Sequence, residues 1–197
     1  RKPQLNVVEF QGSKANNIVI ASGPMGSVVL DAAHPAIFKD ENPEAPPDAR
    51  YKAIVRSGAK NAHGLVPLKS PDGFRWSPMS EAPVITNGAF DSQNLAFWDP
   101  ARKQYRAYWR IFTAGVTTGE TWKPGGVRAI RTGTSSDFLH WGDSNDLRYA
   151  DSPAEQLYTN QVKPYDRAPH ILIGFPTRYV ERGWSPSMRA LPEFEHR

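Results

Sequence analysis

The sequence predicts an all-β protein built from repeated four-stranded units, and three observations support this. The 197 residues include 18 Pro and 15 Gly, spread between short apolar runs, a pattern that argues against long helices. The runs themselves are rich in β-branched and aromatic residues. One turn motif also recurs 65 positions further on, with Ser, Asp and Trp in matching places: Ser70, Asp72 and Trp76, then Ser135, Asp137 and Trp141. A turn that recurs at a fixed spacing indicates a repeated structural unit.

The first part of the chain contains six predicted strands. In chain order they are residues 5–10, 17–21, 34–40, 50–56, 64–70 and 74–79. The proline-rich loop ENPEAPPDA separates the third predicted strand from the fourth, and the PDG turn joins the last two as a hairpin.

The rest of the chain repeats this order. The predicted strands are residues 90–99, 104–112, 127–135 and 139–144, followed by residues 155–165 and 170–179, which the turn DRAP joins. RYKAIVR at 50–56 matches QYRAYWR at 104–110 in its apolar alternation and its closing Arg. FKDENP at 38–43 resembles FWDPAR at 97–102. We therefore expect Trp76 and Trp141 to occupy equivalent sites.

Four antiparallel strands in roughly 60 residues is the period of a β-propeller blade. Units at about 31–80, 91–145 and 155–197 then form one propeller domain over residues 1–197, with about two and a half blades. A β-sandwich with two similar hairpins is the alternative. The spacing from Glu155 places the third turn at 194 or later, so we expect a domain that is incomplete at its C-terminus and that further chain or a partner completes.

Composition and charge exclude several classes of protein. The 24 Lys and Arg are scattered among 20 Asp and Glu, with a net charge of +4, so no basic block predicts nucleic-acid binding. The absence of Cys excludes disulfides, thiol catalysis and zinc–cysteinate sites. The His spacing fits no metal site, and no apolar run is long enough for a transmembrane helix. We therefore expect no cofactor, metal or membrane span, while the oligomeric state stays open.

An acidic residue stands just before or at the first strand of each unit: Asp31, Asp91 and Glu155. The first strand of every propeller blade lines the central channel, so these three carboxylates are expected to converge on one pocket. Carboxylates held close together can divide into an acid and a base, and glycoside cleavage uses such a pair. Asp40 is the alternative to Asp31, because the register of the first unit is loose by one residue. The competing interpretation is that these acids cap surface turns.

Polar and aromatic residues near these acids predict a lining for a sugar. Amides can bind hydroxyl groups, flat rings can stack on a pyranose or furanose, and an Arg can bind a carboxylate or fix an acid. The candidate substrate-binding residues are His34, Gln93, Asn94, Trp109, Arg110, Tyr158 and Asn160. The alternatives are core packing for the aromatic residues and a salt bridge between blades for Arg110.

Taken together, these features resemble a known family. The S-x-D-G-x-x-W turn, the blade length and one acid per leading strand are similar to the five-bladed propeller glycoside hydrolases, the β-fructosidase and arabinanase/β-xylosidase families, numbered 32 and 43. The stretches GAFDSQNLAFWDPARKQYRAYWR, EQLYTNQVKPY and APHILIGFPTRY resemble bacterial proteins of this class. The resemblance implies that Asp31 is the base or nucleophile, that Asp91 orients the acid, and that Glu155 is the general acid. VVLDAAHP and FDSQN depart from the invertase motifs, so the sugar is not implied.

The leading expectation is therefore a glycoside hydrolase that acts on an oligosaccharide or polysaccharide. The resemblance implies a bacterial protein, and a periplasmic or secreted location is compatible with it. Two alternatives stay open: a propeller that binds glycans without cleaving them, and a structural propeller that docks a protein partner.

Overall fold

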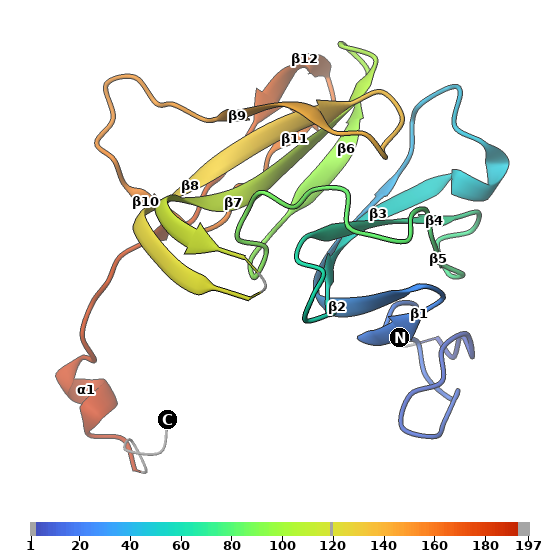
Figure 1. Ribbon diagram of the computed structural model, residues 1–197, viewed down its shortest axis with the longest axis horizontal. Helices are drawn as coiled ribbons and strands as arrows, with labels where there is room; N and C mark the ends of the chain where they lie inside the picture. Colours follow the sequence, from blue (N-terminus) through green and yellow to red (C-terminus); the bar gives the residue numbers. More distant parts are fainter. Residues whose placement is uncertain (1–2, 119, 193–197) are drawn as a thin grey trace.

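The computed structural model describes residues 3–118 and 120–192, which fold almost entirely into antiparallel β-sheets (Figure 1). In this described part, helix is confined to a 3₁₀ turn at Pro47–Ala49 and to α1, Pro186–Arg189, which lies apart from the sheets. Neither is a long apolar helix of the kind that crosses a membrane. The predicted all-β class is confirmed.

The first sheet contains five strands that pair in chain order. They are β1 (Gly23–Met25), β2 (Val28–Lys39), β3 (Tyr51–Ser57), β4 (Leu65–Ser70) and β5 (Ser77–Pro78). The last three correspond to the strands predicted at 50–56, 64–70 and 74–79. β2 begins six residues before the predicted start at 34, and its pairing with β3 shifts between Asp31 and Ala36. Pro35 lies in this stretch and has no N–H for the ladder, which accounts for the bulge.

The second sheet contains four strands, again in chain order. They are β6 (Leu95–Asp99), β7 (Gln104–Thr117), β8 (Trp122–Ser135) and β9 (Gly142–Asp146). The predicted strand at 90–99 is half as long as expected, because residues 90–94 form a loop. β7 and β8 instead continue past their predicted ends as a two-stranded arm, with a bulge between Phe112 and Ala114.

The third unit is one interrupted hairpin. Its strands are β10 (Gln156–Leu157), β11 (Lys163–Tyr165), β12 (Ala168–Ile173) and β13 (Arg178–Tyr179), with β10 paired to β13 and β11 to β12. Each of the two predicted strands is thus broken in the middle. The break occurs where the backbone N–H groups of Asn160 and Gln161 bond to Gln93 of the second unit, at 3.2 and 2.9 Å, instead of to the opposite strand. The turn expected at 194 or later lies outside the described residues.

The strands predicted at 5–10 and 17–21 are wrong. This segment is irregular apart from an isolated bridge between Phe10 and Ser13. The side chain of Asn16 provides local partners for the backbone of this segment. Its amide donates to the carbonyl groups of Val8 and Ser13 at 2.9 and 3.0 Å. A β-branched run needs a partner strand to become a strand, and here none is adjacent.

Two apolar layers hold the three units face to face. The layer between the first and second sheets includes Ile54 and Leu65 from one side and Phe90, Trp109 and Phe138 from the other. The layer between the second sheet and the third hairpin consists of four fully or nearly buried residues, Phe97, Tyr108, Ile130 and Val162. The second sheet is therefore covered on both of its faces, and Figure 1 shows β11 and β12 behind it.

The repeated turn has the same hydrogen bonds in both sheets. The hydroxyl oxygen of Ser70 accepts from the N–H of Gly73 at 2.9 Å, and that of Ser135 accepts from the N–H of Phe138 at 2.9 Å. Each Ser hydroxyl also donates to the Asp two residues on, at 3.1 and 3.0 Å. These turns are thus closed by side-chain bonds to the backbone.

The tryptophans of the two repeated turns also make matching contacts. The indole N–H of Trp76 donates to the carbonyl of Gly73 at 3.0 Å, and that of Trp141 donates to the carbonyl of Phe138 at 3.1 Å. Each ring packs against the apolar layer next to its own sheet. The prediction that Trp76 and Trp141 occupy equivalent sites is confirmed.

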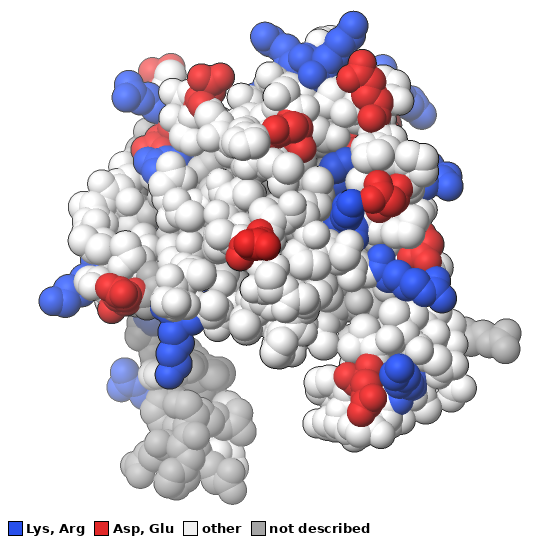
Figure 2. All heavy atoms as spheres, turned by 45° about the vertical axis from the view of Figure 1, so that its right-hand side comes forward, with Lys and Arg blue, Asp and Glu red and all other residues white. Residues whose placement is uncertain are grey.

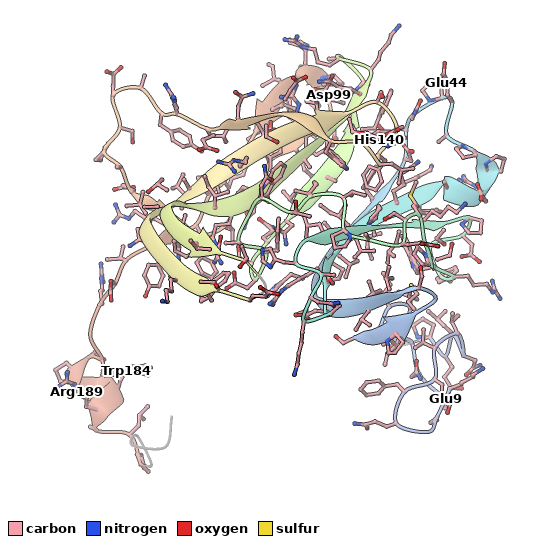
Figure 3. The ribbon with its side chains drawn as sticks, in the orientation of Figure 1. Glu9, Glu44, Asp99, His140, Trp184 and Arg189 are labelled. Carbon is pink, nitrogen blue, oxygen red and sulfur yellow. The ribbon has the colours of Figure 1, made fainter. Side chains whose placement is uncertain are left out.

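A buried polar cluster joins the first sheet to the second. Asp40, directly after β2, accepts hydrogen bonds from Lys52 of β3 and, at 2.7 Å, from the hydroxyl of Tyr105 of β7. Burial raises the pKa of Tyr105 well above its ordinary value, and the carboxylate of Asp40 adds to this shift. Asp99, at the end of β6 in Figure 3, pairs with Arg106 at 3.2 Å in the same way as Asp40 pairs with Lys52. Since the Asp40 side chain is fully enclosed, this alternative to Asp31 is a structural residue.

Ser135→Ala should destabilise the fold. The variant leaves the N–H of Phe138, a fully buried residue, without its acceptor, and an unsatisfied buried group costs about 1–3 kcal/mol. Chemical denaturation measures this as a lower free energy of unfolding. Ser136→Ala, at the exposed neighbouring position, is the matched control and should leave stability within about 0.5 kcal/mol. Equal losses in the two variants would contradict the role of this turn.

Tyr105→Phe should lower stability at neutral pH and change its alkaline pH dependence. Removing the hydroxyl withdraws one donor from buried Asp40, at a cost of about 1–3 kcal/mol. Because the pKa of Tyr105 is raised in the folded state, the unfolded chain loses this proton first, from about pH 10 upward. Above that pH the unaltered protein should lose up to about 1.4 kcal/mol per pH unit that the variant does not lose.

Urea unfolding at pH 7 and at pH 11 measures both effects. Tyr51→Phe, the corresponding position of the first unit, is the control, since its hydroxyl makes none of the hydrogen bonds seen in the described residues. A parallel loss of stability in both variants at pH 7 would argue against the inter-sheet role of Tyr105.

Candidate functional site

Each predicted acid forms an ion pair with an arginine of its own unit. The pairs are Asp31 with Arg56 at 3.0 Å, Asp91 with Arg110, and Glu155 with Arg178 at 2.7 Å. The three carboxylates are similarly accessible, with exposed fractions of 31%, 39% and 38%. Within residues 3–118 and 120–192, no ion pair or hydrogen bond joins one of these acids to another. The structure thus gives each acid a positive partner and leaves part of it open to solvent.

Two of the acids also occupy comparable places in the fold. Asp31 lies near the start of β2, directly opposite its arginine on β3. Asp91 lies in the loop before β6, and Glu155 immediately precedes β10. Asp31 thus lies within the second strand of the first sheet, whereas Asp91 and Glu155 precede the first strands of the second and third units.

The first strands of the three units share one hollow. A cavity of about 640 Å³ is lined by residues 35–39 of β2, 95–98 of β6, and Lys163 and Pro164 of β11. Lining by consecutive first strands is the arrangement that a radial repeat predicts. Among the candidate site residues, this hollow contains only Gln93. The three acids lie toward the other end of these strands.

Glu155 lines a second pocket, of about 420 Å³. Its walls are the β7–β8 arm, with Thr113 and Arg128, and the segment from Leu147 to Leu157, with Tyr149 and Ser152. Residues with hydroxyl, carboxylate and guanidinium groups are therefore among those that line one pocket. A pocket of this size, with few polar groups on an apolar wall, is typical of a small-molecule or single-sugar subsite.

An arginine–aromatic cluster connects Asp91 to this pocket. The guanidinium of Arg110, which binds Asp91, lies 5.1 Å from the ring centre of Phe112 and 5.3 Å from that of Tyr158. Arg128, on the wall of the pocket, contacts the same two rings at 5.1 and 5.9 Å. Burial lowers the pKa of Arg110, although the charge of Asp91 opposes this shift. Arg110 and Arg128 thus share two aromatic rings, and Arg128 is one of the residues that line the pocket of Glu155.

Several of the candidate binding residues are parts of the core. Trp109 is fully buried, and its indole N–H donates to the carbonyl of Asn87 at 3.2 Å. The ring fits beside Gly133, where an added Cβ would lie 2.9 Å from it. Asn94 and Asn160 are each only 1% exposed. These three side chains have no free face for a sugar in this structure.

The remaining candidates differ in their surroundings. The side-chain oxygen of Gln93 accepts the two backbone bonds from the third unit described above, so it links units. Tyr158 stacks on Tyr179, with ring centres 6.2 Å apart, beside Arg110. His34 is exposed on β2. Of these candidates, Arg110 binds the predicted acid Asp91, and Tyr158 contacts Arg110.

The sequence analysis named Arg110 as a residue that could fix an acid, but it missed Arg56 and Arg178 as partners of the other two acids and the place of Arg128 beside the pocket. One signal for the partners was present, because the matched segments at 50–56 and 104–110 both close with an Arg, and these are Arg56 and Arg110. Nothing in the sequence indicated Arg128, because its place on the pocket depends on how the third unit packs.

The chemistry open to this site is that of carboxylates, guanidinium groups and hydroxyl groups. In the described chain, no three His, Asp or Glu side chains are grouped so that they could hold a metal ion. No protein-family model and no curated protein matches the chain.

Asp91→Asn and Asp31→Asn should differ strongly in stability. Asp91 compensates the charge of Arg110, whose side chain is 2% exposed, whereas the partner of Asp31, Arg56, is 37% exposed. Because Asp91 itself is 39% exposed, its loss should cost less than the about 3–5 kcal/mol of a fully buried pair but more than the about 0–1 kcal/mol of an exposed pair such as Asp31 with Arg56. Thermal and urea unfolding of the two variants test this. Similar small losses would show that Arg110 does not depend on Asp91.

Proposed function

We propose that this protein is a propeller-type glycoside hydrolase acting on an oligosaccharide or polysaccharide. The supporting observation is that Asp91 and Glu155 stand at comparable places in consecutive units, each paired with an arginine, and that Glu155 lines a pocket of about 420 Å³. The face-to-face stacking of four-stranded and five-stranded sheets, with first strands around one hollow, supports the propeller assignment.

In this proposal Glu155 protonates the departing glycosidic oxygen. Arg178 donates to Oε1 of Glu155, and since an arginine has no acceptor, the proton must be carried by the other carboxylate oxygen. Asp91, held by Arg110, is the proposed residue that orients the acid. Asp31 is the proposed base or nucleophile, and the separation between two such carboxylates decides the stereochemical outcome.

One observation favours a second function, glycan binding without cleavage. Each of the three acids forms an ion pair with an arginine. An ion-paired carboxylate is ionised, and it can still accept hydrogen bonds from sugar hydroxyl groups. A binding protein needs these acceptors but needs no carboxyl group that gives up a proton. Release of reducing sugar from a panel of polysaccharides separates the two functions, because only the hydrolase produces it.

Glu155→Gln should remove most hydrolysis of natural linkages while sugar binding is kept. The amide retains the shape of the side chain but cannot donate the acidic proton, and loss of general acid help costs about 10²–10⁴-fold in rate. Aryl glycosides with good leaving groups need little protonation and should be affected much less. Measured kcat values on an activated aryl glycoside and on a natural disaccharide provide the comparison.

Glu181→Gln, at an exposed position beyond β13, is the control and should leave both rates unchanged. An equal fall on both substrates in the Glu155 variant, or no fall on either, would show that Glu155 is not the acid.

A further inference from the structure

Most sheet edges in the described chain are protected against pairing with another strand. The outermost strands of the first sheet, β1 and β5, are only three and two residues long, and β5 ends in Pro78. The last strand of the second sheet, β9, exposes all five of its residues, but these are polar or Gly and include Asp143 and Asp146. Short strands, Pro and charged side chains are the usual means by which an edge avoids pairing.

The outer strand of the third hairpin lacks this protection. β12 pairs with β11 and with no other strand of residues 3–118 and 120–192. It is six residues long, and the run APHILIGF at 168–175, which contains it, has no Lys, Arg, Asp or Glu. Acidic and basic side chains are, by contrast, interspersed over the face drawn in Figure 2. A long uncharged edge of this kind is a predicted site for pairing with a further strand.

Exposed apolar side chains follow this edge. Leu172 packs on the apolar layer of the second sheet, so its neighbours Ile171 and Ile173 point to the opposite face of the hairpin. These two side chains belong to residues that are 47% and 37% exposed, and Phe175, just beyond the strand, is 69% exposed. Exposed apolar groups that lie together on a strand mark a surface for contact with another protein chain.

The other strand of the hairpin indicates which partner fits. β11 carries Lys163 and Pro164, so the opposite edge of this two-stranded sheet is protected. Pairing of β12 with β12 of a second copy, across a two-fold axis, gives a four-stranded sheet with β11 at both ends. The second sheet also has four strands, whereas a two-stranded sheet alone is only marginally stable. Association then stops at two copies, because the new sheet has no unprotected edge.

We propose that two copies of this chain associate by antiparallel pairing of their β12 strands. The two-fold arrangement brings the same uncharged run beside itself, so Ile171 and Ile173 of one copy lie next to those of the second copy. The backbone groups on the free edge of β12 then gain hydrogen-bond partners. This inference does not depend on the carbohydrate function, since none of the residues at 168–175 lines the pocket of Glu155.

Sedimentation of the whole chain measures the association. Over about 1–100 µM, we expect a reversible equilibrium between monomer and dimer. Ile171→Lys and Ile173→Lys should each weaken dimerisation by about 10-fold or more, because the two-fold axis places like charges on neighbouring strands. Ile37→Lys on β2 is the matched control, since this isoleucine is 46% exposed, and it should leave the dimer unchanged.

Single-cysteine variants locate the axis. The chain has no Cys, so one introduced Cys can form a disulfide only with another copy. A disulfide requires Cα atoms within about 7 Å of each other, and in a two-fold antiparallel pair only residues at the axis meet this condition. Mild oxidation of variants at each position from 169 to 173 should therefore give covalent dimers at one position or at two neighbours. Ile37→Cys should give none.

Each outcome bears on a different part of this inference. A monomer at every concentration, with no disulfide at any of these positions, overturns the pairing of two copies. A dimer that both Lys variants leave intact overturns the role of β12, and species larger than dimers in the unaltered protein overturn the closed arrangement. If a Lys variant does not fold, as judged by near-UV circular dichroism, the cysteine variants decide. Sugar release is measured independently, so either proposal can fail while the other stands.

Discussion

Burial of the second sheet on both faces is the constraint on which the rest of this structure depends. Neighbouring residues of β7 point to opposite faces, yet Tyr108 is 4% and Trp109 0% exposed. A sheet with one wet face would place a polar residue at one of these positions. The sequence AYWRIF, apolar on both faces, is therefore the signature of a strand between two neighbours.

Double burial also explains why charged residues of this sheet occur in pairs. Arg110 follows Tyr108 and Trp109 on β7, so the strand takes its guanidinium into a region with little water. Its cost of desolvation is offset by Asp91 and by the rings of Phe112 and Tyr158. Asp91, a candidate catalytic residue, is thus also the structural counter-ion of Arg110. A substitution of Asp91 is therefore expected to affect both stability and activity.

The parts of this fold that the sequence predicts are those that local chemistry determines. The Ser–Asp–Trp turns are closed by bonds within six or seven residues, so their recurrence at 70 and 135 predicts equivalent hairpins. The run at 17–21 has the composition of a strand but finds no partner, and pairing is not a local property. Trp109 was expected to face a sugar because alternation assigns a side chain to a face but does not say what covers it. The ion pair of Glu155 with Arg178 and the packing of Arg128 against Tyr158 and Tyr179 depend on how the third unit is placed, so no spacing rule predicts them.

Polar contacts within a unit repeat, whereas contacts between units do not. Asp40 with Lys52 and Asp99 with Arg106 are corresponding pairs inside the first and second units. The junction between these units uses the Tyr105 hydroxyl on Asp40. The next junction instead uses the hydroxyl of Ser92, which donates to the carbonyl of Tyr158 at 2.9 Å, and the amide oxygen of Gln93. Each junction between units has its own polar contacts. If two units exchanged places, at least one buried polar group would lose its partner. Each such loss costs about 1–3 kcal/mol, so the observed order of units is favoured. The shared turns and pairs define the unit, and the unshared contacts define its neighbours, which is how similar units are kept in one order.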